Sequence, residues 1–134
     1  MYNKILVALG LDHGHGQSAM EMARKLKNDG GEILAGHVIE PVTGFASYYL
    51  PADHEAEVKA SALKGIAERI GEAKDATPVL LSGNPGSTLI EYAETEGADC
   101  IIVGSHKPVM GDYLLGSTAA RVVRHAHCAV HVLR

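Results

Sequence analysis

The stretch ADCIIVGSHKPVMGDYLLGSTAARVVRHA, residues 98–126, predicts a buried strand, a glycine-bounded loop and a helix in direct succession. The apolar run CIIV at residues 100–103 is typical of a strand that is covered on both faces. The strand is expected to end at Gly104, and a helix to begin at GST, residues 116–118. A loop that enters a helix in this way exposes backbone N–H groups at the positive end of the helix dipole. This arrangement predicts an anion site, most often a phosphate site.

Outward from this stretch, strands and helices alternate along the chain. Short apolar runs predict the other strands at residues 4–9, 32–38, 77–81 and 127–133. Helical periodicity predicts helices at residues 18–28, 55–70, 87–96 and 117–126. The alternation predicts an α/β fold, a five-stranded parallel sheet with helices on both faces. Residues 42–54 show no clear period, and we interpret them as a variable insertion.

Local signals predict where several helices begin and which residues they bury. Ser18 and Glu21 have the spacing of a capping box, and Ser87 is expected to cap a later helix. The apolar spacing places Leu63 and Val123 among the inward-facing residues of their helices.

Length and composition set limits on the class of protein. The 134 residues are enough for one domain, and a net charge of −4 argues against binding to nucleic acid or to anionic membranes. No apolar run reaches the roughly 18 residues of a membrane span, and we expect no signal peptide. Cys100 and Cys128 do not form a CxxC pair, so we expect a cytoplasmic protein without structural disulfides.

The ends of the predicted strands indicate where a ligand would bind. In open parallel α/β sheets, ligands bind at the carboxyl ends of the strands, where the winding direction reverses. Leu9, Val38 and Val103 each stand at the end of a predicted strand. We therefore expect them to border one crevice, next to Gly104.

Several motifs, in their order and spacing, resemble the universal stress protein family. The residues that carry the resemblance are KILVAL at 4–9, GHVIE at 36–40 and the last forty residues, from the ADCIIVGSHKP segment to the end. The resemblance implies a flavodoxin-like layout, similar to that of the adenine-nucleotide α-hydrolases, with strand order 3-2-1-4-5. It also implies a homodimer.

One branch of that family binds ATP or AMP through a G-x2-G-x9-G-(S/T) motif. Gly104 matches its first glycine, and Gly116 with Ser117 match its last glycine and hydroxyl residue. Lys107 stands where the motif has its second glycine, and the loop is one residue shorter than the motif requires.

The resemblance also implies a set of nucleotide-binding positions. From the residues themselves, we expect His106 to order the loop through a hydrogen bond, and Lys107 either to offer a charge to a phosphate or to point to solvent. Thr118 adds a second hydroxyl beside Ser117. The positions expected around the adenosine are Ala8 and Leu9 beside it, Asp12 near the ribose, Val38 at the adenine edge and Val103 beside the base.

Two other site patterns occur near the first strand. His13 and His15 have the spacing of a metal chelate, but no cysteine or carboxylate accompanies them at ligand spacing, so we expect no metal site built by the protein. A divalent ion such as Mg²⁺ that arrives with the ATP phosphates is the favoured alternative. Residues 14–19 fit a dinucleotide fingerprint formally, but they begin five residues after Leu9, too far from the strand end.

We therefore expect an ATP- or AMP-binding stress-response regulatory protein that acts as a homodimer with an unidentified protein partner. The last strand has nothing left to cover its edge, so Ala129–Leu133 is predicted to pair with its copy across a two-fold axis. One alternative is a dimeric interaction module without nucleotide. Another is a slow ATPase or self-phosphorylating protein with Ser117 or Thr118 as acceptor, although no base is aimed at either.

Overall fold

The computed structural model describes residues 1–11, 15–105 and 115–134. Three predicted site residues, Asp12, His106 and Lys107, lie outside these ranges. The described chain folds into the elements β1 (Tyr2–Ala8), α1 (Gly16–Leu26), β2 (Lys27–Ile39), the 3-10 helix η1 (Gly44–Tyr49), α2 (His54–Ile70), β3 (Thr77–Ser82), α3 (Pro85–Glu96), β4 (Cys100–Gly104), α4 (Ser117–His125) and β5 (Ala129–Leu133).

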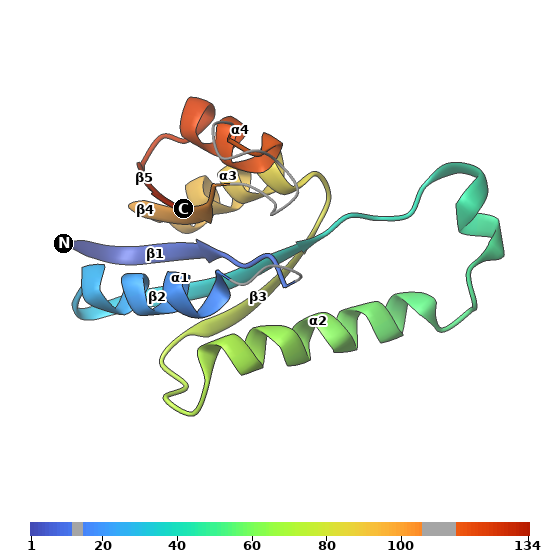
Figure 1. Ribbon diagram of the computed structural model, residues 1–134, viewed down its shortest axis with the longest axis horizontal. Coiled ribbons are helices and arrows are strands. Elements are labelled where there is room, and N and C mark those ends of the chain that lie inside the picture. The colour runs from blue at the N-terminus through green and yellow to red at the C-terminus, as the bar shows by residue number, and fades with distance from the viewer. Residues whose placement is uncertain (12–14, 106–114) are drawn as a thin grey trace.

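The five strands form one parallel sheet in the order β3-β2-β1-β4-β5 (Figure 1). The predicted α/β class and strand order are confirmed. β1 lies at the centre and pairs with β2 on one side and β4 on the other. The winding direction therefore reverses between β1 and β4, which places the switch point of the sheet at their carboxyl ends.

Helices cover both faces of the sheet, α1 and α2 on one face and α3 and α4 on the other (Figure 1). Alternate strand residues supply the two cores: Ile5 and Val7 face α1 and α2, whereas Leu6 faces α3 and α4. In β4, Ile102 and Ile101 divide in the same way. The continuous apolar runs are thus explained, because a strand buried on both faces has no polar side.

Two helices begin two residues before their predicted start. α1 begins at Gly16, so Ser18 lies inside its first turn and does not cap it. α3 begins at Pro85, and the side chain of Asn84 accepts a hydrogen bond from the Ser87 backbone N–H over 3.2 Å. Asparagine is as strong a cap as serine, and proline favours the first helical position.

Two expected core residues lie on the surface. Leu63 is 45% exposed and Val123 is 48% exposed. In each helix a narrower stripe reaches the sheet, Ala62, Ile66 and Ile70 in α2 and Ala119 and Val122 in α4. The predicted positions lie just beside those stripes, where a helix on a flat sheet already faces solvent.

The segment between β2 and α2 projects away from the sheet (Figure 1). It contains η1, in which the ring of Phe45 packs against those of Tyr48 and Tyr49, and all three side chains are exposed. The first turns of α2 extend beyond the carboxyl edge of the sheet with it (Figure 1). Within the described ranges, no helix combines the length and apolar character needed to cross a membrane.

Candidate functional site

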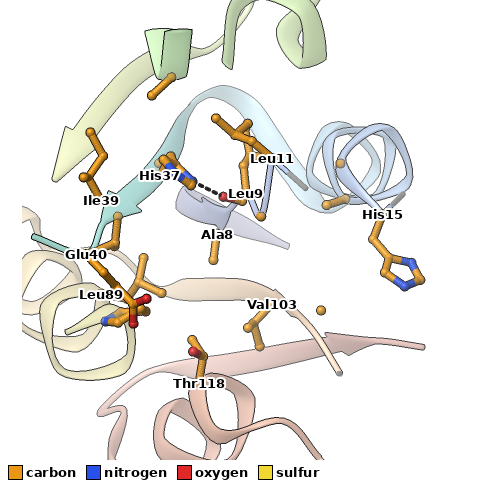
Figure 2. Close-up of a pocket in the computed structure, with 18 of the residues that line it drawn as sticks. Ala8, Leu9, Leu11, His15, His37, Ile39, Glu40, Leu89, Val103 and Thr118 are labelled. Atoms are coloured by element: carbon orange, nitrogen blue, oxygen red, sulfur yellow. Dashed lines mark hydrogen bonds between the residues drawn. The ribbon is translucent and has the colours of Figure 1, made fainter. Parts of the chain in front are cut away.

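A cleft of about 770 Å³ opens at the carboxyl edge of the sheet, at the switch point between β1 and β4. Its size lies within the range of small-molecule sites. The structure brings together around it every predicted site residue that it describes: Ala8, Leu9, Val38, Val103, Gly104, Gly116, Ser117 and Thr118. Figure 2 shows Ala8 of β1 and Thr118 of α4 pointing toward one another across this space.

The strand ends give the cleft an apolar wall. Leu9 and Val103 are each only 4% exposed, and Val38 is half-buried against the α3 and α4 side of the sheet. Flat apolar groups of a ligand can pack against such residues, while the backbone of the strand ends offers hydrogen bonds at their edge.

The start of α4 is fixed by main-chain hydrogen bonds beside the end of β4. The Gly116 N–H donates to the Ser105 carbonyl oxygen over 2.6 Å, and the Ser105 N–H donates to the Leu133 carbonyl oxygen over 2.7 Å. Residue 116 precedes the helix and, being glycine, has no side chain to cap it. Within the described part of the chain, no hydrogen bond is made by the N–H groups of Ser117 and Thr118 in the first turn, so a ligand or water can bind them.

Each of the four described α-helices follows a strand of the parallel sheet and begins at this cleft. The first residues of these helices, Gly16, His54, Pro85 and Ser117, all line it. The positive ends of their dipoles point toward the same edge of the sheet. The combination favours a ligand with an anionic group.

The end of β1 is held against β2 by one main-chain and one side-chain hydrogen bond. The Leu9 N–H donates to the Gly36 carbonyl oxygen over 2.7 Å. The Nδ1 atom of His37 lies 2.7 Å from the Leu9 carbonyl oxygen, as the dashed line in Figure 2 shows. A carbonyl only accepts, so Nδ1 of His37 carries the proton and donates.

The prediction from sequence missed the wall of the cleft that α2 provides. His54, Glu57, Val58 and Ser61 line this wall, on one face of the first two turns of α2. Their spacing of three and four residues was the available signal. This spacing does not identify the wall by itself, because residues 54–61 extend past the sheet and none of them is buried.

Metal ligands do not gather in the part of the chain that the structure describes, where no three histidine, cysteine or acidic side chains are placed to hold an ion. His15 of the predicted histidine pair lines the cleft, and His13 lies outside the described residues.

The sequence profile of the Universal stress protein family matches residues 1–134. The chain belongs to this family. It is 31% identical to "Universal stress protein A homolog 2" of Coxiella burnetii, over 99% of this chain and 95% of the relative. It is 30% identical to "Universal stress protein MJ0531" of Methanocaldococcus jannaschii, over 100% of this chain and 83% of the relative.

Solved structures have the same fold. The hypothetical protein PH0823 matches with a TM-score of 0.74 and 26% identity, over 99% of this chain and 96% of that one. A universal stress protein in complex with cAMP matches with a TM-score of 0.68 and 20% identity, over 99% and 97% of the two chains. A universal stress protein from Archaeoglobus fulgidus in complex with dAMP matches with a TM-score of 0.63 and 20% identity, over 99% and 98%.

Proposed function

We propose that this universal stress protein binds an adenine nucleotide, ATP or AMP, in the cleft at the β1–β4 switch point. The observation that carries the proposal is the uncapped start of α4 at Ser117 and Thr118, in the same cleft as the apolar strand ends. One ligand that has both an anionic phosphate and a flat base fits these two features. Two relatives of the same fold, solved with cAMP and dAMP, support an adenine ligand.

The phosphates belong at the first turn of α4, between Gly104 and Thr118, where backbone N–H groups and the helix dipole favour negative charge. The adenosine belongs beside Leu9, Val38 and Val103, where β1, β2 and β4 end. This orientation keeps the phosphates at the helix starts, and a Mg²⁺ ion bound to ATP would arrive with them.

A homodimer through the outer edge of β5 is part of the proposal. β5 is the last strand of the sheet, and of the described strands only β4 pairs with it. Pairing of Ala129–Leu133 with a second copy would satisfy its outer main-chain groups. We also propose a cytoplasmic location, supported by free thiols at Cys100 and Cys128, and a regulatory role through a protein partner.

The test is to purify the protein from cells, denature it, and identify any released nucleotide by mass spectrometry. Isothermal titration of the emptied protein with ATP and AMP, with GTP as control, then measures affinity and base preference. About one adenine nucleotide per subunit, or saturable ATP or AMP binding that exceeds GTP binding, supports the proposal. No nucleotide and no binding at millimolar ATP would overturn it and leave a dimeric interaction module.

A further inference from the structure

Arg69 reaches from α2 to the backbone that follows β1, although it is not among the residues that line the cleft. Its Nη2 donates a hydrogen bond to the Leu11 carbonyl oxygen over 2.7 Å, and its Nη1 donates to the Gly65 carbonyl oxygen over 3.3 Å. The Arg69 side chain is 23% exposed. A mostly buried guanidinium that donates to a carbonyl makes a stronger hydrogen bond than a neutral donor would.

Two glycines allow this close approach. A Cβ atom at Gly16 would lie 2.7 Å from Cγ of Arg69, so the stem of the arginine runs directly over the first residue of α1. A Cβ atom at Gly65 would lie 3.0 Å from Cδ1 of Leu11, so the leucine side chain packs directly on the backbone of α2. Arg69 of α2 thus packs on Gly16 of α1, and Leu11 packs on Gly65 of α2.

The ion pair of Arg69 does not account for its position. Glu68 is its acidic neighbour, with 3.8 Å between Oε2 and Nη1, and the Glu68 side chain is 60% exposed. An exposed pair at this distance adds little stability. The hydrogen bond to Leu11 and the contact with Gly16 are the contacts that hold the arginine where it is.

We propose that Arg69 is a positioning residue for the nucleotide site. Leu11 and Gly16 line the cleft on either side of residues 12–14, and Arg69 holds both against α2. It thereby fixes where the backbone leaves β1 after Leu9, beside the expected adenosine. This inference rests on the proposed function, because it assigns the residue a role in nucleotide affinity.

Arg24 offers a matched control. It also joins α1 to the end of α2, through hydrogen bonds from Nη2 to the Ile70 carbonyl oxygen over 2.7 Å and from Nε to Asp75 over 2.7 Å. None of these three residues lines the cleft. Removal of either guanidinium should destabilise the packing of α1 against α2. Only the loss of Arg69 should weaken nucleotide binding.

The experiment compares Arg69→Met, Arg69→Lys and Arg24→Met with the wild type, by titration of the emptied proteins with ATP and by urea unfolding. We expect Arg69→Met to weaken ATP binding about tenfold, because the Leu11 carbonyl loses a charge-assisted hydrogen bond. Arg69→Lys should recover part of the affinity, since an ammonium can donate one such bond. Arg24→Met should bind ATP with an affinity within about twofold of the wild type, although its free energy of unfolding should fall by a similar amount to that of Arg69→Met.

Three results are decisive. If the wild type binds no adenine nucleotide, the proposed function fails and this role fails with it. If the wild type binds ATP and Arg69→Met binds equally well, or no worse than Arg24→Met, the positioning role alone is overturned. Should Arg69→Met fail to fold, the comparison rests on Arg69→Lys, which keeps an aliphatic stem over Gly16, and an ATP affinity equal to that of the wild type in this folded variant contradicts the proposal.

Discussion

The imidazole of His37 and the carbonyl of Leu9 form a hydrogen bond that extends the pairing of β1 and β2 beyond the end of β1. The Nδ1 atom lies 2.7 Å from the carbonyl oxygen. Main-chain pairing of the two strands ends at Ala8 with Gly36, and the Leu9 N–H adds one further bond to Gly36. A side chain on β2 therefore fixes Leu9, the first residue after β1, in the wall of the cleft.

Replacement of His37 by alanine should leave the Leu9 carbonyl without this partner in a half-buried site. We expect the free energy of unfolding to fall by about 1–3 kcal/mol, the usual cost of an unsatisfied buried polar group. Urea denaturation measures the loss, with His125→Ala, at the exposed end of α4, as control. In the wild type, ¹⁵N NMR should find the proton of the neutral His37 ring on Nδ1. A proton on Nε2 would contradict the bond.

Gly116→Val should weaken nucleotide binding with little effect on folding. Gly116 has φ −61° and ψ 159°, extended backbone that valine adopts readily, so the substitution adds no backbone strain. Its side chain would instead occupy space at the first turn of α4, where we place the phosphates. Titration should give an ATP affinity at least about tenfold lower, a difference of roughly 1.4 kcal/mol.

A matched control for Gly116→Val is Val123→Ala, on the exposed side of the same helix. It should bind ATP like the wild type. Equal ATP affinity of Gly116→Val and the wild type would mean that the start of α4 is not the phosphate site.

The sheet could be predicted from the sequence because burial on both faces leaves a strong signal. Residues 5–9 and 100–103 are apolar without interruption, and few other structures require that pattern. The start of α4 at Ser117 could be predicted for a similar reason, since glycine and hydroxyl residues after a buried strand indicate a helix start. These features are local in sequence, and local rules describe them well.

The missed features depend on contacts between distant segments. Ser18 has the better capping pattern, yet α1 begins at Gly16, where Arg69 packs on the helix backbone. The α2 wall of the cleft arises because α2 extends beyond the sheet, and no residue pattern within residues 54–61 records that overhang. Contacts between residues about fifty positions apart in the sequence can be predicted only once the fold is known.

Asp99 makes the stability of the sheet depend on pH. Its carboxylate accepts hydrogen bonds from the backbone N–H groups of Asn3 and Lys4, over 2.8 and 2.9 Å. Burial raises the pKa of Asp99, but these backbone hydrogen bonds outweigh it and lower the pKa overall. The stabilisation is complete above the unfolded-state pKa of about 3.9 and is lost as the pH falls through the lower pKa of the folded state.

Asp99→Asn should therefore cost about 1.5–3 kcal/mol at pH 7, because an amide offers one acceptor and turns its NH₂ toward the second N–H. Urea unfolding should be measured from about pH 2 to pH 7. Below about pH 4, the free energy of unfolding should fall less in the variant than in the wild type. Asp53→Asn is the control, since the Asp53 side chain makes no hydrogen bond to the start of α2. Parallel pH profiles for Asp99→Asn and the wild type would contradict this assignment.

The outer edge of β5 provides the test of the homodimer. The Leu133 carbonyl accepts a hydrogen bond from the Ser105 N–H, so the main-chain groups of Leu133 face β4. Successive residues of a strand direct their N–H and C=O groups to opposite edges. The Val132 N–H therefore points away from β4. Val132→Pro removes that outward donor and keeps the pairing with β4, a position that proline tolerates on an edge strand. Light scattering should then give the monomer mass of 14.1 kDa in place of twice that value. Val132→Ala, which shortens the side chain but keeps the N–H, should remain a dimer, and a dimeric Val132→Pro would place the interface elsewhere.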